Sequence, residues 1–359
     1  MRLATLVTLC LGLAGAAGAA PRAKAVILFL ADAGGLPTLS AAAIEAGRPQ
    51  QLFIQRMPWV GLMDTSSASE WVTDSAAGMT AIVTGEKTHN GVVSQSDAAV
   101  RAERDGRVLK TILEHAEERG LSTGVVSNSP ITDATPAACY AHVNDRSQTG
   151  EIMAQAFSPR SGDGVDVMIG AGRAKILQAT AERGLDIDAE ARRRGYELQA
   201  SLATVSADTR RLVVLLEDGS FDLGAATAIA LRILSRNPRG YFLMVESDLH
   251  ADDVAFALRR MVEFDALIER TAATVDPKQT LVIFTADHSF DLRVRAGRKG
   301  ESLLANPEAP KPSLRRDKGH SGEEVVVAAT GPGAERVRGF FPNTKLFHVM
   351  MAAYGWEPR

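Results

Sequence analysis

Acidic and imidazole side chains follow three apolar stretches of the sequence, at the points where buried strands would end. Asp32 follows VILFLA, Glu246 follows YFLMV, and the pair Asp287 and His288 follows LVIFTA. A single carboxylate in such a place often does no more than cap the next helix. Oxygen and nitrogen ligands from three strand ends could instead meet at one edge of a sheet and hold divalent cations. We therefore treat these four residues as candidate metal ligands.

A serine at the start of a predicted helix is the candidate nucleophile. In the segment WVTDSAAGMTAIVTGEKTHNGVVS (residues 71–94), Ser75 follows Asp74 and precedes a run of small residues. Its Oγ would then lie at a helix N-terminus, where free N–H groups and the helix dipole attract an anion such as phosphate. Most Asp and Ser residues at such a point only cap the helix. The segment alone does not decide between the two roles.

The segment SPITDATPAACYAHVNDR (residues 129–146) brings four further polar side chains into one short span: Asp133, Thr135, His142 and Arg146. The guanidinium of Arg146 could bind two oxygens of a phosphate with its fork of donors. A lone arginine is more often a solvated surface charge, so this role depends on its neighbours.

The elements that must position these side chains are apolar runs that alternate with helix-compatible segments. Strands are predicted at 25–31, 59–63, 121–127, 165–169, 212–216, 240–246, 280–285 and 324–329, and helices include 40–46, 109–119 and 344–353. This alternation favours a mostly parallel sheet covered on both faces, so we predict an α/β fold with three layers, αβα, in one domain. Functional groups should lie where the strands end. The stretches 95–107 and 293–318 are expected to be surface excursions, each too short for a separate domain.

Composition limits the class of protein. The chain has 359 residues, of which 45% are hydrophobic and 23% charged, so it can bury a sizeable core. The formal net charge of -3 and the absence of a Lys/Arg run argue against a nucleic-acid-binding module.

The first twenty residues have the pattern of a secretory signal peptide. Arg2 is followed by an apolar run at 3–13 and by small residues at 14–20, with cleavage expected near Ala19 or Ala20. The apolar run is too short for a membrane span. We therefore expect a secreted or periplasmic protein, not bound to a membrane, whose catalytic domain covers 21–359. Only Cys139 would remain after cleavage, so no internal disulfide is expected.

The blocks together resemble the alkaline phosphatase family. VTDSAAGMTA resembles its nucleophile segment, DATPAACYAHVNDR its threonine-and-arginine segment, TADH its metal pair and KGHSGEEVVVAATGPGA a late histidine segment, while GVDVMIGAGR matches a stretch between them. The blocks occur in the family's order and, with the first strand, extend from residue 25 to residue 334. The resemblance implies an alkaline phosphatase-like fold and a metal-dependent enzyme that hydrolyses small-molecule phosphate monoesters. A homodimer is an assembly compatible with it.

The resemblance also implies a role for each matching residue. Ser75 would attack phosphorus and become a phosphoserine, and Arg146 would bind the phosphate. It implies two zinc ions and one magnesium ion. The zinc that activates the nucleophile would be bound by Asp32, Asp287 and His288, together with Ser75 itself, and the zinc at the leaving oxygen by His320. Magnesium would be bound by Thr135 and Glu246, with Asp32 as a bridge. Asp133 would contact the magnesium through water.

The sequence departs from the family after Glu246. The chain reads VESDLHADDV, which leaves five residues fewer than the family has before His250. His250 is expected to remain a zinc ligand. Asp248 is the nearest carboxylate to complete its site, Asp252 is a second candidate, and Glu246 could instead move from magnesium to zinc. The region after residue 290 is also too short for the crown-like insertion of longer relatives, so the active site should be comparatively open.

Three other functions were weighed. Phosphodiesterases of the same superfamily usually carry a threonine nucleophile and lack the arginine, so Ser75 with Arg146 favours the monoesterase. A sulfatase is disfavoured because no C-x-P-x-R or S-x-P-x-R motif is present. A metal-binding or phosphate-binding homologue without catalysis is kept open by the shortened stretch after Glu246.

Overall fold

A ten-stranded sheet forms the centre of the protein, whose computed structural model describes residues 22–250, 252–305 and 312–356. The signal peptide predicted at 1–20 lies outside the described residues. In spatial order the strands are β12 (Gly339–Pro342), β2 (Trp59–Asp64), β11 (Val325–Thr330), β8 (Thr280–Thr285), β1 (Ala25–Asp32), β7 (Tyr241–Asp248), β3 (Ser122–Pro130), β4 (Val167–Ala171), β6 (Leu212–Leu215) and β5 (Glu197–Gln199). Of these, β11 alone runs antiparallel to its neighbours, so the predicted mostly parallel sheet is confirmed.

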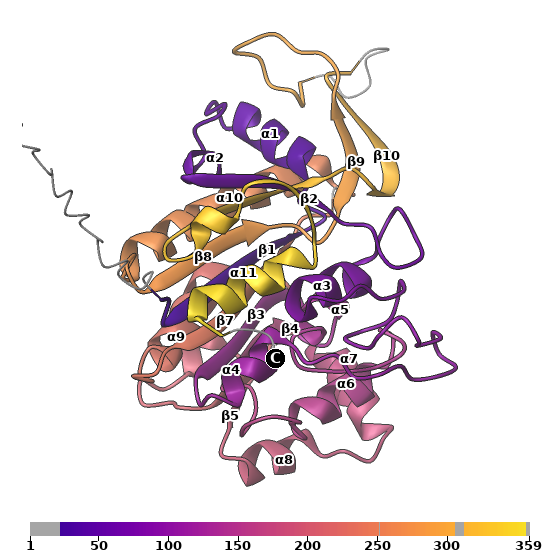
Figure 1. The fold of residues 1–359 in the computed structure, drawn as a ribbon, viewed down its shortest axis with the longest axis vertical. Helices are drawn as coiled ribbons and strands as arrows, with labels where there is room; N and C mark the ends of the chain where they lie inside the picture. Colours follow the sequence, from indigo (N-terminus) through magenta and orange to yellow (C-terminus); the bar gives the residue numbers. More distant parts are fainter. Residues whose placement is uncertain (1–21, 251, 306–311, 357–359) are drawn as a thin grey trace, which may run out of the picture.

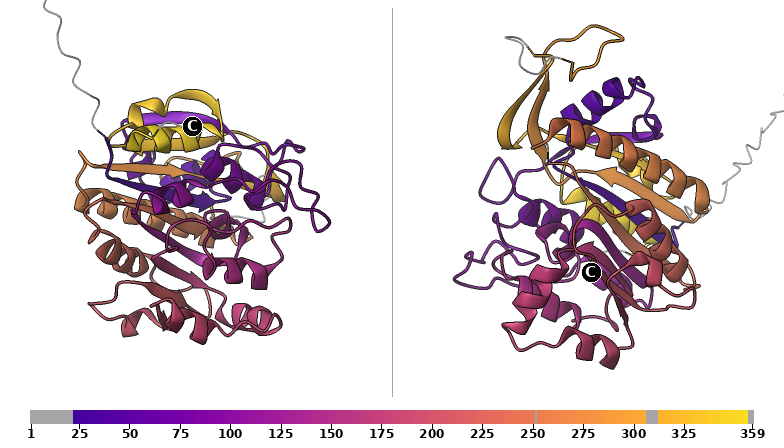
Figure 2. Two further views of the ribbon diagram at one scale, coloured as in Figure 1. Left: turned by 60° about the horizontal axis from the view of Figure 1, so that its bottom comes forward. Right: turned by 180° about the vertical axis from the view of Figure 1, so that it is seen from behind.

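Helices cover both faces of this sheet (Figures 1 and 2). One face carries α3 (Ser75–Thr84), α4 (Ile112–Glu117), α5 (Ala134–Ala137) and α11 (Lys345–Tyr354), which pack against one another. The other face carries α1 (Leu36–Glu45), α2 (Phe53–Arg56), α9 (Leu223–Leu234) and α10 (Val254–Thr274). The remaining helices, α6 (Thr149–Ala156), α7 (Arg173–Ala181) and α8 (Ile187–Arg193), lie toward the β5 end of the sheet. The predicted αβα layers are therefore confirmed.

The central strands are apolar up to their carboxyl ends, because neither face of the sheet meets water there. All eight residues of β1 are buried, and seven of the eight in β7. Such continuous burial is typical of parallel strands covered by helices, whereas one-sided sheets show alternation. The carboxyl ends of β1, β7 and β8 lie side by side, because β1 pairs in parallel with both of the others.

The stretch predicted as an excursion at 293–318 contains structure of its own. β9 (Ser289–Val294) and β10 (Leu314–Ser321) pair antiparallel and form an arm that stands out beyond the main sheet (Figure 1). The arm is anchored at its base, where His320 of β10 faces Phe290 of β9. It therefore delivers one residue of the late histidine segment to the edge of the sheet.

None of the helices in the described part of the chain is long and apolar enough to cross a membrane. Among the described residues, Cys139 is a buried free cysteine.

Candidate active site

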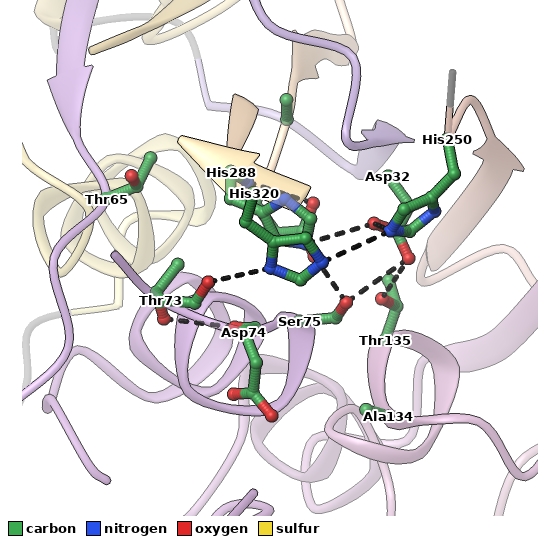
Figure 3. Close-up of polar contacts among 12 residues, drawn as sticks. Asp32, Thr65, Thr73, Asp74, Ser75, Ala134, Thr135, His250, His288 and His320 are labelled. Atoms are coloured by element: carbon green, nitrogen blue, oxygen red, sulfur yellow. Dashed lines mark hydrogen bonds and ion pairs between the residues drawn. The ribbon is translucent and has the colours of Figure 1, made fainter. Parts of the chain in front are cut away.

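Six of the side chains predicted from the sequence lie close together at the carboxyl edge of the parallel strands (Figure 3): Asp32, Ser75, Thr135, His250, His288 and His320. Asp32 is the last residue of β1, and Asp287 and His288 follow β8 after one intervening residue, Ala286. His250 lies two residues after β7, and His320 enters from the arm. Segments far apart in the chain thus bring carboxylates and imidazoles to one place, as the strand-end pattern predicted.

Ser75 is the first residue of α3, and the helix is capped by its neighbour Asp74 and not by Ser75. Asp74 is the N-cap, and its Oδ1 accepts a hydrogen bond from the Ala77 N–H at 3.0 Å. The Ser75 hydroxyl is therefore not needed for capping and points into the site. Its Oγ donates to Asp32 Oδ2 at 3.3 Å and lies 3.2 Å from His288 Nε2.

A glycine lets the nucleophile helix approach the metal pair. A Cβ atom at Gly78 would lie 2.8 Å from the backbone oxygen of Asp287, closer than real Cβ atoms come. With glycine at this position, α3 packs directly against the end of β8. This close approach holds Ser75 within hydrogen-bonding distance of His288.

Asp32 lies between the nucleophile and the histidines. Its Oδ1 is 3.3 Å from His288 Nε2 and 3.8 Å from His250 Nε2, and its Oδ2 also accepts a long 3.5 Å hydrogen bond from the Thr135 hydroxyl. Burial alone would raise the pKa of Asp32, but the hydrogen bond and charge of His288, with the charge of His250, hold that pKa well below its usual range. Asp32 therefore remains ionised and able to bind a cation.

Two overlapping groups of side chains have the composition and spacing of metal sites. The ligand atoms of Asp32, Asp287 and His288 all lie within 4.8 Å of one another, and so do those of His250, His288 and His320. The carboxylate oxygens Asp32 Oδ1 and Asp287 Oδ2 are buried without a hydrogen-bond partner among the described residues. Such atoms are costly unless something else satisfies them. The donor set therefore fits divalent cations.

Glu246 supplies a third buried carboxylate without a complete set of partners. It lies two residues before the end of β7 rather than at the end, because β7 pairs with β1 as far as Asp32. Its Oε2 accepts a hydrogen bond from the Ser127 hydroxyl, whereas its Oε1 has no partner among the described residues. Burial, then the charge of Asp32, raises the pKa of Glu246 well above its ordinary value. A cation beside Glu246 would reverse this effect.

The three histidines all present Nε2 to the centre of the site. Nδ1 of His288 donates to the Ser289 carbonyl at 3.1 Å, and Nδ1 of His320 donates to the Thr73 carbonyl at 3.0 Å. Nδ1 of His250 instead contacts a carboxylate oxygen of Asp248 at 2.8 Å. Anchoring one ring nitrogen in this way fixes the ring and leaves the other nitrogen for a metal.

Asp248 is the predicted ligand that the structure does not bring into either group. It is the last residue of β7, and its carboxylate lies on the Nδ1 side of His250, away from the Nε2 atoms. The sequence pattern predicted a strand that ends at Glu246. The strand instead continues for two residues, with Ser247 paired to Ala31 and Asp248 paired to Asp32. Asp252, the second candidate carboxylate, is exposed, and its Oδ1 lies 3.6 Å from Nη1 of Arg316.

Arg146 is held between two carboxylates beside Ser75. Its Nη1 donates to Asp74 Oδ2 at 3.1 Å and its Nη2 donates to Asp133 Oδ1 at 2.9 Å. Asp133 also accepts from the Ala134 N–H and caps α5, the short helix that carries Thr135. Although burial alone would lower the pKa of Arg146, the two carboxylates raise it above its ordinary value. The arginine is therefore oriented rather than solvated.

Some residues have roles that the sequence reasoning missed or left open. Ser127, which holds Glu246, is a polar residue at a strand end and could have been found by the signal that pointed to Asp32. His142, a candidate from its segment, is buried away from the site between the Ser94 carbonyl at 2.8 Å and Glu114 at 3.0 Å. His142 therefore links the segments that carry Ser94 and Glu114, and neither contact brings it near Ser75.

Comparisons with known proteins agree with this geometry. The family model described as alkaline phosphatase matches residues 23–213 and 217–308. The chain is 30% identical to a streptomycin-6-phosphate phosphatase from Streptomyces griseus, over 94% of this chain and 92% of that protein. It is 26% identical to the tissue-nonspecific alkaline phosphatase of Rattus norvegicus, over 92% and 83% of the two chains.

Solved structures show the same relationship. The alkaline phosphatase from the Antarctic bacterium TAB5 superposes with a TM-score of 0.78 at 26% identity, over 94% of this chain and all of that one. A mutant of that enzyme is described with magnesium bound in a site called M3. The Thermus thermophilus alkaline phosphatase, at 22% identity and a TM-score of 0.80 over 94% and 92% of the two chains, supports the fold alone. The chain therefore belongs to the alkaline phosphatase family and is a metal-binding phosphomonoesterase of that type.

Proposed function

We propose that this protein is an exported enzyme that hydrolyses small-molecule phosphate monoesters through a phosphoserine at Ser75, with two zinc ions and one magnesium ion. The observation that supports this most is the placement of the Ser75 hydroxyl. It lies at the N-terminus of α3, within 3.3 Å of both Asp32 and His288. The S. griseus relative is named for a phosphate monoester of a small molecule, which is the substrate class that we propose here.

Each of the three ions would be bound by a different set of residues. Asp32, Asp287 and His288, with Ser75, would hold one zinc ion, and His250 with His320 would hold the other. Asp32, Thr135 and Glu246 would hold magnesium, with Asp133 close by. When bound, these cations would neutralise the charge of the phosphate and withdraw charge from the reacting oxygens.

The protein's own groups account for binding and proton transfer. Two donors of the Arg146 guanidinium are engaged by Asp74 and Asp133, and its remaining N–H groups can bind two oxygens of the phosphate. The Ser75 proton has an acceptor within reach in Asp32 Oδ2, since His288 Nε2 would be taken up by zinc. Ser75 Oγ then bonds to phosphorus while the bond from phosphorus to the ester oxygen breaks, and that oxygen leaves as the alcohol with the proton that Ser75 has given up. Water afterwards displaces Ser75, which releases inorganic phosphate and restores the hydroxyl.

Export and domain organisation are parts of the same proposal. Residues 1–20 would be removed as a signal peptide, and 21–359 would form one catalytic domain in the periplasm or outside the cell. The N-terminal sequence of the protein recovered from culture would test the cleavage. The homodimer stays a hypothesis, which the mass of the purified enzyme in solution would test.

Turnover of an aryl phosphate, with and without added zinc and magnesium, tests the proposal directly. We expect hydrolysis of the monoester to require metal, and an aryl diester assayed in parallel to react far more slowly. Faster turnover of the diester would support the phosphodiesterase instead. No turnover of either ester by the metal-loaded protein would favour a binding protein without catalysis.

Arg146→Ala should weaken the binding of substrate and of inorganic phosphate together, because both present the same oxygens to the guanidinium. The loss of a bidentate, charge-assisted contact should cost about 1.5–3 kcal/mol of binding free energy, or roughly a 10- to 150-fold loss of affinity. The inhibition constant of phosphate and the KM of an aryl phosphate measure this.

The matched control is Arg101→Ala, which removes an exposed arginine that lies 3.2 Å from Asp145, the neighbour of Arg146. This variant should bind phosphate like the wild type. Unchanged phosphate inhibition in Arg146→Ala would show that Arg146 is not the phosphate ligand.

A further inference from the structure

The last residue of β7, Asp248, has a carboxylate that contacts one histidine of the site, His250, whose ring is shown in Figure 3. Oδ1 of Asp248 lies 2.8 Å from Nδ1 of His250 and also accepts the His250 backbone N–H at 3.0 Å. The Asp248 backbone N–H in turn donates to the Asn128 side chain at 2.8 Å. Two of these interactions join the Asp248 carboxylate to His250, and the third ties the Asp248 backbone to Asn128 of β3.

The orientation of the ring decides which atom faces the site. Nε2 of His250 lies 3.4 Å from Nε2 of His320 and 3.8 Å from Asp32 Oδ1. The two nitrogens of an imidazole point away from each other, so an oxygen bonded at Nδ1 cannot coordinate the ion that Nε2 binds. Asp248 thus holds the position relative to His250 that the Ser289 and Thr73 carbonyls hold relative to His288 and His320.

We infer that Asp248 is a positioning residue that orients His250 for the cation, and not a ligand of that cation. This inference rests on the proposed function and assigns a role within the same site. The group formed by His250, His288 and His320 then contains imidazole ligands only. The stretch after Glu246, which is five residues shorter than in the family, would then lack a coordinating carboxylate. The carboxylate that remains there, Asp248, would orient the ring of His250.

Binding of Co²⁺ to the metal-free protein tests the inference without reference to activity. Cobalt can replace zinc in such sites, and its visible absorption bands report the type and number of its ligands. We expect Asp248→Asn to bind as many cobalt ions as the wild type with the same band positions, because an amide oxygen can still accept from Nδ1. Affinity, measured by competition with a chromophoric chelator, should fall about tenfold, and in Asp248→Ala about ten- to a hundredfold.

A second variant and a control separate positioning from a general structural effect. Asn128→Ala removes the support of Asp248 without touching the imidazole, and should lower cobalt affinity a few-fold with unchanged bands. Asp252→Asn, which alters an exposed carboxylate in the same connection, should bind cobalt like the wild type. The far-UV circular dichroism of each metal-free variant would verify its fold.

Several results would overturn the inference. The loss of one bound cobalt ion or a shift of the bands in Asp248→Asn would show that Asp248 is a ligand. Unchanged affinity in both Asp248 variants would show that it has no role at the site. A wild-type protein that binds no cobalt or zinc at all would contradict the proposed function, whereas the first two results leave that function intact.

Discussion

Replacing Ser75 with alanine should lower the turnover of an aryl phosphate by roughly 10³-fold or more, because no other group takes the place of a covalent nucleophile. Metal content should stay close to that of the wild type, since Asp32, Asp287 and His288 remain. Folding should also survive the change. Asp74, and not Ser75, caps α3, and alanine has a high helix propensity.

Trapping of the intermediate gives the second measurement. Wild-type enzyme mixed with labelled phosphate at low pH should retain the label on the peptide that contains Ser75, and Ser75→Ala should retain none. Ser67→Ala is a matched control, because this serine lies in the loop before α3 and its hydroxyl pairs with the backbone of Glu70. Label on another residue, or turnover within tenfold of the wild type in Ser75→Ala, would contradict the proposed nucleophile.

The strands that carry the site could be predicted because their sequences are unambiguous. VILFLA and YFLMV are uninterrupted apolar runs, and LVIFTA contains only one polar residue, Thr285. In the structure these runs are buried in β1, β7 and β8, with Ala286 just beyond the end of β8. Parallel neighbours place their carboxyl ends together, so Asp32 and the pair Asp287 and His288 could be expected to meet. The fold class was predicted on these grounds and the family from its resemblance to an ordered set of motif blocks, and both are confirmed.

Other elements could not be predicted, because their structure depends on contacts distant in sequence. Strand β10 contains LRRDKGHS, which has little apolar character, and it forms by pairing with β9 outside the main sheet. His320 therefore has no local signal, and the family resemblance alone pointed to it. Strand β12 is a four-residue edge strand, too short to be detected by pattern.

The end of β7 shows how tertiary pairing overrides a local preference. Ser247 and Asp248 are residues that favour turns, which agrees with the predicted end of the strand at Glu246. Pairing with Ala31 and Asp32 extends the strand instead, because a parallel neighbour offers backbone partners at that register. The side chain of Asp248 is thereby placed beside the ring of His250 and outside both groups of ligand atoms.

Removal of the metals should abolish turnover and lower the thermal stability of the protein, and zinc with magnesium should restore both. The carboxyl groups of Asp32, Glu246 and Asp287 are buried, and each has one oxygen without a hydrogen-bond partner among the described residues. A cation that binds only the folded state stabilises it by mass action, about 2.7 kcal/mol for each ion at a free concentration one hundred times its Kd. The thermal midpoint before and after chelation measures this effect.

Glu246→Gln tests whether Glu246 is a cation ligand or only a buried polar side chain that binds no cation. Burial, together with the charge of Asp32, raises the pKa of Glu246 and so favours the neutral form of this carboxyl in the metal-free protein. Glutamine has the same shape without the charge and should cost the metal-free protein little stability. The same variant should lose most of the stabilisation that magnesium gives to the wild type. Equal stabilisation of both proteins by magnesium would exclude Glu246 as a ligand.

The pH dependence of the metal-free protein should follow from the same carboxyl group. A carboxyl whose pKa is higher in the folded than in the unfolded state retains its proton on folding, so stability falls as pH rises above the unfolded value of about 4.5. The free energy of unfolding of metal-free wild type, relative to Glu246→Gln, should therefore decrease as pH rises above that value. Saturating magnesium should reverse the trend, because the cation binds the ionised form and gains affinity as the proton leaves. Urea unfolding of both proteins at several pH values, with and without magnesium, would measure the difference. Parallel curves for the two proteins in both conditions would show that Glu246 carries neither the proton nor the cation.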